Sequence, residues 1–216
     1  MALYDEETSP IGVYAFGNIV GTPEPDLGDK LAWQAGLKLD NNQIAPMLEV
    51  IDQAINEYRQ QFPSFPNDTA KLQLPFGPAK DADPDNPDGD KIESETETIF
   101  KFKRKLEFTS KKTGRVMQRS APTIYDAKGT VVNDQIDNIG WGSIGRIYYK
   151  ALPYTYLKKS GITLALEGFQ IKELKAGGGS SSGPAAPIEG GGWEAPPSNS
   201  IDMTDDTTGN FFELDE

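Results

Sequence analysis

The segment at residues 98–115 reads TIFKFKRKLEFTSKKTGR, and apolar and charged side chains alternate through most of its first half. Successive side chains of a β-strand point to opposite faces, so this period of two predicts a strand rather than a helix. The rings on one face predict a buried core, so the chain has to build a sheet around this strand. The ring-bearing face would hold Phe100, Phe102, Leu106 and Phe108 with Arg104, and the other face Lys101, Lys103, Lys105 and Glu107.

The same pattern recurs along the chain and predicts a mainly β fold of five or more strands. SKKTG, which ends at Gly114, and LKKSG are typical of hairpin turns. Gly36 is a candidate bulge position, and Pro153 should disturb its ladder, so that the residues after it project from an edge or a bulge. The other predicted strands are residues 11–20, 30–40, 115–126, 143–156 and 161–174.

One segment changes to a helical period. In NNQIAPMLEVIDQAINEYRQQF the apolar residues follow each other at helical spacing, which predicts one helix over about residues 43–61. Asn41 or Asn42 could cap it, and Pro46 is tolerated because it falls in the first turn. Prolines and crowded acidic residues then predict a loop over 63–97, with an acidic loop at 77–97.

The formal net charge of −12 conceals an asymmetry. Residues 1–90 carry 16 acidic and 5 basic side chains, whereas residues 91–175 carry 9 acidic and 16 basic ones. Residues 176–216 carry 8 acidic side chains and no basic one. Such asymmetry indicates charged partners. The composition predicts a folded domain over 1–175, a flexible Gly/Ser/Pro linker over 176–200 and a disordered acidic tail over 201–216.

The chain has 216 residues, without cysteine or histidine. This excludes disulfides, thiolate nucleophiles, cysteine-based zinc sites and every catalytic arrangement that needs imidazole. An enzyme would have to use carboxylates, Ser/Lys pairs or Tyr. We also find no run of 18 apolar residues and no leader pattern, so we expect an intracellular protein without a membrane span.

Two other motifs resemble ligand sites but lack the required context. GWGSIG matches the glycine pattern of dinucleotide-binding turns, yet neither a buried strand before it nor a helix after it is predicted. DADPDNPDGDKIE resembles a calcium loop, but Asn86 and Ile92 occupy the positions that need glycine and a bidentate glutamate. We therefore expect no cofactor and no metal, and interpret the second motif as a solvated acidic loop.

Cations and rings are also interleaved in YYKALPYTYLKK, where Lys150 precedes Tyr154 and Tyr156. Alternate lysines of a strand lie ~6.6 Å apart, close to the phosphate repeat of an extended polynucleotide. Rings beside cations suit binding of single strands without sequence preference, because every base has a π-face. Both patterns also have a plainer explanation: lysines protect an exposed strand from aggregation, and tyrosines lie half buried in a sheet.

The order of these elements, from the strand pair and helix through TIFKFKRKLEFTSKKTGR, GRIYYKALPYTY and ITLALEGFQIKEL to an acidic tail, resembles the single-stranded DNA-binding proteins of tailed bacteriophages. The resemblance covers most of residues 11–216 and is most specific from residue 98 to 174. It implies an OB-fold, a five-stranded Greek-key barrel, with one inserted helix and a disordered acidic C-terminal tail. It also implies a role in phage DNA replication, recombination and repair, in the cytoplasm of the infected bacterial host.

The resemblance further implies the site residues. A Pro-Tyr-x-aromatic segment, in which the rings stack on bases, corresponds to Pro153, Tyr154 and Tyr156. We expect DNA contacts from Lys101, Lys103, Lys105, Arg115, Arg119, Lys150, Tyr154 and Tyr156. The family dimerises and recruits DNA polymerase and helicase/primase through its tail. Here the tail residues are Asp205, Asp206, Phe211, Phe212, Glu213, Asp215 and Glu216, so the rings precede the last acidic residues, whereas the family's tail typically ends in an aromatic residue.

The sequence thus favours a non-enzymatic protein that coats exposed single-stranded DNA. A phage structural or adaptor protein, whose basic face binds an acidic protein, is the main alternative. An OB-fold that binds RNA is the other.

Overall fold

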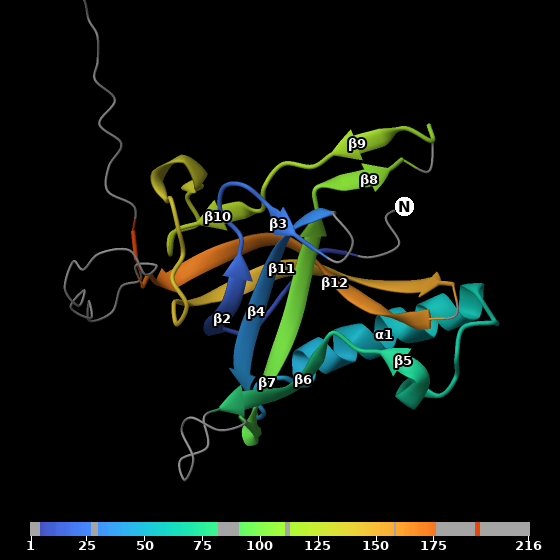
Figure 1. The fold of residues 1–216 in the computed structure, drawn as a ribbon. Helices are drawn as coiled ribbons and strands as arrows, with labels where there is room; N and C mark the ends of the chain where they lie inside the picture. Colours follow the sequence, from blue (N-terminus) through green and yellow to red (C-terminus); the bar gives the residue numbers. More distant parts are fainter. Residues whose placement is uncertain are drawn as a thin grey trace, which may run out of the picture.

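Five strands close into a barrel in the computed structural model, in the order β2–β4–β7–β12–β11 and back to β2 (Figure 1). This is the five-stranded Greek-key barrel of an OB-fold, and it confirms the predicted fold class. The structure describes residues 5–26, 30–81, 91–110, 113–157, 159–175 and 193–194. The barrel strands are β2 (Gly12–Asn18), β4 (Leu31–Asp40), β7 (Ile92–Lys105), β11 (Ile144–Tyr156) and β12 (Lys159–Glu173).

Aromatic and aliphatic side chains fill the barrel, as the alternation in β7 predicts. Phe100 and Phe102 are 0% and 1% exposed, and the Phe102 ring meets the Tyr149 ring edge-on at 5.5 Å. Trp33 is also buried, and its indole N–H donates a hydrogen bond to the Gly21 carbonyl at 2.9 Å. A slip of one residue in β7 would expose its rings, so burial fixes the register of this strand.

The bulge in the first strand pair lies in β2, so the prediction of a bulge at Gly36 is wrong. Tyr14 pairs with Leu37, and Phe16 pairs with Gly36, which leaves Ala15 as the extra residue. Gly36 is required for another reason: a Cβ there would come within 2.2 Å of the Phe16 ring.

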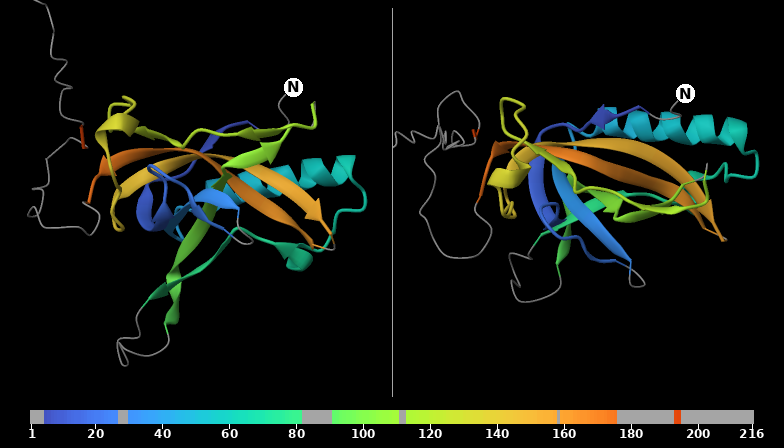
Figure 2. Two further views of the ribbon diagram at one scale, coloured as in Figure 1. Left: turned by 45° about the horizontal axis from the view of Figure 1, so that its top comes forward. Right: turned by 90° about the horizontal axis from the view of Figure 1, so that it is seen from above.

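Helix α1 (Ala45–Gln61) packs against β11, on the far side of the barrel from β4 (Figure 2, right). Its N-cap is Ile44, which makes no capping hydrogen bond through its side chain, so the predicted cap at Asn41 or Asn42 is wrong. Asn41 instead accepts a hydrogen bond from the Thr98 hydroxyl of β7 at 2.7 Å. No helix in the described part of the chain is long and apolar enough to cross a membrane. The buried residues of α1 are Met47, Ile51, Ala54 and Ile55.

Strands occupy much of the region predicted as a loop over 63–97, including both ends of the acidic loop at 77–97. β6 (Phe76–Asp81) pairs antiparallel with β7, which already begins at Ile92, so that prediction is wrong there. Ring packing explains the pairing, because Phe76 lies 5.3 Å from Phe100 between ring centroids. Residues 82–90 lie outside the described part. Shorter elements precede β6: the 3₁₀ turn η1 (Thr69–Lys71) and β5 (Leu72–Gln73).

A two-stranded hairpin follows β7 and stands apart from the barrel sheet (Figure 1). The predicted strands 99–109 and 115–126 are each interrupted. In the first, the amide of Leu106 donates to the Leu31 carbonyl at 2.9 Å, and in the second, the amide of Arg119 donates to the Leu106 carbonyl at 2.7 Å. The predicted turn at Gly114 is confirmed, with φ +68°. The hairpin strands are β8 (Glu107–Thr109) and β9 (Val116–Gln118). The remaining elements are β1 (Glu7–Thr8), β3 (Glu24–Pro25), β10 (Thr123–Tyr125) and the 3₁₀ turn η2 (Asn133–Gln135).

Two residues of the predicted flexible linker over 176–200 are docked on the barrel. The Trp193 amide donates to the Lys172 carbonyl at 2.7 Å, and the Trp193 carbonyl accepts from the Ala127 amide at 2.9 Å. Glu194 pairs with Lys128 at 2.6 Å. The linker prediction is therefore wrong for this dipeptide, and the other linker residues and the tail over 201–216 lie outside the described part.

Candidate nucleic-acid interface

The three lysines of β7 lie on the outside of the barrel, one residue out of phase with the buried rings. Lys101 and Lys105 are exposed. Lys103 is half buried, because its Nζ lies 2.8 Å from both carboxylate oxygens of Asp26. The predicted row therefore exists, but its central charge is shared with an acidic residue from the β3–β4 connection.

A row of paired residues connects β7 to β11. Lys150 on β11 pairs with Ala165 on β12, and Ala165 pairs with Lys103 on β7. Paired residues of neighbouring strands point to the same face, so the two lysines flank a small side chain on the outer surface. Small residues make the floor of β12 along this face, at Gly161, Thr163 and Ala165.

Tyr154 and Tyr156 share the outward face of β11 with Lys150, because all three have the same parity. Tyr156 is 72% exposed, whereas the Tyr154 hydroxyl donates to the Gln73 side chain at 2.8 Å. Pro153 does not disturb the ladder: it pairs with Ile162 without a register shift. Among the described strands, only β12 pairs with this part of β11, so the rings project from an edge rather than from a bulge.

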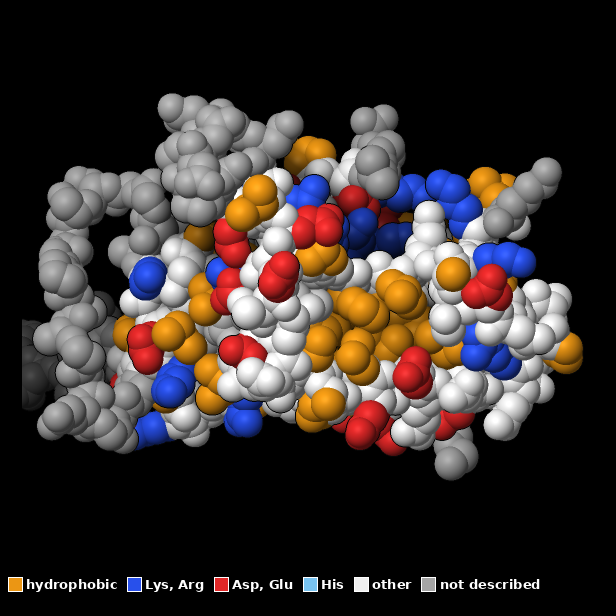
Figure 3. Space-filling view, turned by 90° about the horizontal axis from the view of Figure 1, so that it is seen from below, with side chains coloured by type: hydrophobic (Ala, Val, Ile, Leu, Met, Phe, Trp, Pro, Cys, Tyr) orange, Lys and Arg blue, Asp and Glu red, His pale blue; other side chains and the backbone are white. Residues whose placement is uncertain are grey.

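A groove of about 600 Å³ continues the basic surface beyond the end of β7. Figure 3 shows Lys and Arg side chains gathered in a recess near the upper edge of the view, with acidic side chains beside them. Lys30, just before β4, contributes a cation that the sequence analysis did not name as a site residue. The groove is lined by Lys30, Leu31, Lys105, Leu106, Glu107, Phe108, Thr109, Val116 and Arg119.

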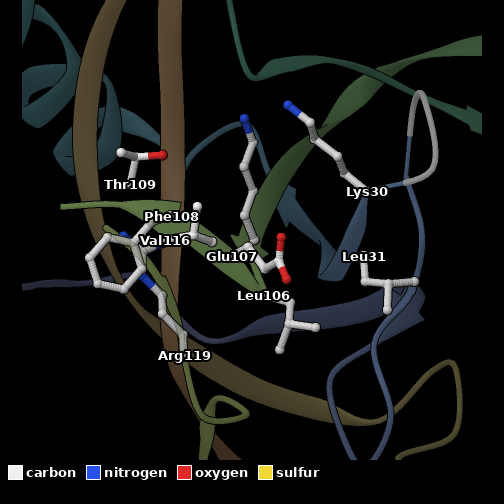
Figure 4. Close-up of a pocket in the computed structure, with 9 residues that line it drawn as sticks. Lys30, Leu31, Leu106, Glu107, Phe108, Thr109, Val116 and Arg119 are labelled. Carbon is white, nitrogen blue, oxygen red and sulfur yellow. The ribbon is translucent and has the colours of Figure 1, made fainter. Parts of the chain in front are cut away.

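Arg119 enters this groove from the end of β9. Its guanidinium lies over the Phe108 ring, 4.5 Å from the centroid, and Figure 4 shows the two side chains against one another. Burial lowers the pKa of Arg119, and the nearby charge of Arg104 lowers it further. Arg115 is exposed on the hairpin and does not line the groove, while Lys111 and Lys112 lie outside the described residues.

Two other cations of the barrel are occupied by acidic partners. Arg104 is held by Glu167 at 2.5 Å and by the Leu166 carbonyl at 3.2 Å. Lys38 pairs with Glu97 at 2.7 Å, and this hydrogen bond is the main reason why its pKa is raised. Among the described residues no group of three or more acidic side chains could hold a metal ion. Arg104 and Lys38 are therefore less available to an anionic ligand than the exposed Lys101 and Lys105.

The arrangement brings most of the predicted site together. Lys101, Lys103 and Lys105 lie on β7 and Lys150 lies on β11, with β12 between the two strands. Arg119 lines one groove with Lys105. We define the outward residues of β7, β12 and β11, with the groove, as the basic face. Trp141, in contrast, is 69% exposed beside Gly140, whose amide binds the Lys175 carbonyl at the end of β12.

Comparison with known proteins gives the family. Residues 30–174 match the family model described as single-stranded DNA-binding protein of bacteriophage T7. The crystal structure of gp2.5, a single-stranded DNA-binding protein encoded by bacteriophage T7, is similar with a TM-score of 0.58 and 22% identity, over 89% of this chain and 100% of that one. No curated protein sequence matches the chain significantly.

A second solved structure has the same fold. It is the single-stranded DNA-binding protein of bacteriophage Enc34 in complex with single-stranded DNA, with a TM-score of 0.55 and 11% identity over 81% of this chain and 89% of that one. At these identities the two structures show a shared fold alone, whereas the family model covers most of the barrel. The chain belongs to the family of the bacteriophage T7 single-stranded DNA-binding protein.

Proposed function

We propose that this protein coats single-stranded DNA without sequence preference. The observation that carries the proposal is the row Lys150–Ala165–Lys103, which joins cations of two strands across a floor of small side chains. A polynucleotide can approach such a floor closely. Membership of the family and the Enc34 complex support the same ligand.

Phosphates would contact the basic face and bases would stack at its edge. Lys101, Lys103, Lys105 and Lys150 supply the cations of the strands, and Arg119 extends them into the groove. We assign Arg115 to the phosphates as well, from its exposed place on the hairpin. Tyr154 and Tyr156 offer rings, each of which contributes ~1–3 kcal/mol when a base stacks on it. No step of this function needs a catalytic group.

Titration with oligo-dT of increasing length tests the proposal. Affinity should rise with length, and it should fall roughly 50-fold between 50 and 200 mM salt if ~4 phosphates are neutralised. If the affinity for oligo-dT does not change with its length, the result would favour a structural or adaptor protein with an acidic partner. Tighter binding to a matched RNA strand would favour an RNA-binding protein.

The tyrosine assignment needs its own variant. Replacing Tyr154 and Tyr156 together by Ala should weaken oligo-dT binding ~10-fold or more, because two stacking positions are lost. Circular dichroism and a urea unfolding curve would show that the barrel remains folded. If affinity stays level in the folded double variant, the bases stack elsewhere.

We further propose that the protein acts in phage DNA replication, recombination and repair, in the cytoplasm of the infected host. The acidic tail over 201–216 would contact the phage DNA polymerase and helicase/primase, and the protein could form a homodimer. The support is the family resemblance and the net acidity of the tail, which has no basic residue. Pull-down of the polymerase by full-length protein, and its loss on deletion of 201–216, would test the tail.

A further inference from the structure

A β-bulge turns one ring of β2 out of the barrel. Tyr14 pairs with Leu37, and both are 0% exposed inside. Phe16 is two residues further on and would share this interior face if alternation continued. The extra residue Ala15 shifts the alternation, so Phe16 pairs with Gly36 on the outside instead.

The ring of Phe16 is seated on β4 at a position that has no side chain. Gly36 lies between Ala35 and Leu37, which are both 0% exposed, so a side chain at Gly36 would point outward. A Cβ built there would come within 2.2 Å of the Phe16 ring. Phe16 thus covers the outer surface of β4 and stays half buried rather than entering the core.

Gly36, over which the Phe16 ring lies, is next to the lysines of β7. Gly36 pairs with Lys101, and the next row of the same face pairs Gln34 with Lys103. On β11, Tyr154 likewise shares the outward face with Lys150. Bulges commonly re-aim a side chain next to a functional site, and a ring held on the surface contributes little to a core.

We propose that Phe16 is a third base-stacking position of the basic face. The bulge at Ala15 aims the ring, and the absent side chain of Gly36 leaves room for it. A strand that stacks on Tyr154 and crosses the floor of β12 and the lysines of β7 would reach Phe16 on the β2 side. This inference rests on the proposed binding of single-stranded DNA.

The test compares Phe16→Leu with the full-length wild type on two strands of equal length. Leucine keeps apolar volume over Gly36 but has no π-face. On oligo-dT the variant should bind ~5-fold or more weakly, the loss expected for one stacked base. On an abasic strand with the same number of phosphates, wild type and variant should bind equally. Phe16→Tyr keeps the ring and should restore the wild-type affinity for oligo-dT.

Two further variants complete the test. Trp141→Leu removes an exposed ring at the Lys175 end of the barrel and should bind oligo-dT as the wild type does. Gly36→Ala leaves Phe16 in the sequence but displaces its ring, so it should lose affinity for oligo-dT as Phe16→Leu does. Urea unfolding curves would report whether each variant keeps its fold.

The outcomes separate the inference from the function on which it rests. If the wild type binds no oligo-dT, the proposed function itself is wrong. If the wild type binds and folded Phe16→Leu binds equally well, Phe16 does not stack on bases. An equal loss on the abasic strand would also overturn the inference, because it would show that Phe16 only supports the fold of the face.

Discussion

Ala165 offers a direct perturbation of the basic face, because it lies between Lys103 and Lys150 in one row and is 8% exposed. Ala165→Glu would place a carboxylate between the two ammonium groups. There it would compete with a DNA phosphate for the same two cations. Ala165→Gln has nearly the same size and no charge, so it is the matched control for crowding.

The magnitude follows from counterion release. Each phosphate contact with a single strand contributes about −0.7 to the slope of log Kobs against log salt. Cancelling one contact therefore costs ~5-fold in affinity at 0.1 M salt, and cancelling both costs ~25-fold. Lys103 already shares its charge with Asp26, so we expect the lower half of this range.

Fluorescence anisotropy of labelled oligo-dT between 50 and 400 mM salt measures both quantities. Relative to Ala165→Gln, the Glu variant should bind more weakly at low salt and show a shallower slope, and the two should converge at high salt. Urea unfolding curves check that both variants fold. If the Glu and Gln variants bind equally at every salt concentration, phosphates do not contact Lys103 or Lys150.

Three other perturbations test separate parts of the molecule. Deleting residues 201–216 should tighten oligo-dT binding several-fold at 50 mM salt, because the tail carries only acidic charges and would compete with DNA for the basic face; unchanged affinity would refute competition by the tail. Trp193→Ala removes a ring that packs against the core, so the docked backbone should open more often. Hydrogen exchange at the Ala127 amide, which donates to the backbone carbonyl of residue 193 at 2.9 Å, should then speed up by ~10-fold, and unchanged protection would contradict the docking. Burial raises the pKa of Tyr149 to about 12 in the folded protein, above the ordinary value of about 10 in the unfolded chain. The contribution of the neutral Tyr149 to the free energy of unfolding is therefore complete below pH 10 and is lost as the pH rises through 12. The loss is on the order of 2 kcal/mol, and urea unfolding at pH 9 and pH 11.5 should show a smaller decrease for Tyr149→Phe than for wild type; equal decreases would contradict the assignment.

Local patterns predicted the parts of the fold that depend on burial. The alternation in β7 placed Phe100 and Phe102 inside and Lys101 outside, because one buried face fixes a strand's register. The helical spacing of apolar residues predicted α1 for the same reason, because one face of this helix is buried. The OB-fold itself was predicted from the family resemblance. The β6–β7 pairing was missed because the crowded acidic residues of this region predict a loop, and no local pattern signals the contact between Phe76 and Phe100.

The remaining errors come from contacts between distant residues. The ion pair of Lys103 with Asp26 joins residues 77 positions apart, and no local pattern signals it. The extra residue Ala15 makes Phe16 point out of the barrel, whereas strict alternation from Tyr14 would point it into the core. Trp193 was predicted to belong to a flexible linker because the segment around it is rich in glycine and proline. An aromatic ring in such a segment is the one sequence signal that could have indicated that this part of the linker packs on the barrel.

Lysine acetylation with and without saturating oligo-dT, mapped by mass spectrometry, tests the central claim most directly. The account predicts that DNA protects Lys101, Lys105 and Lys150, while Lys172, at the end of the barrel that holds Trp193, reacts equally in both states. Protection at Lys172 with none on β7 and β11 would contradict it.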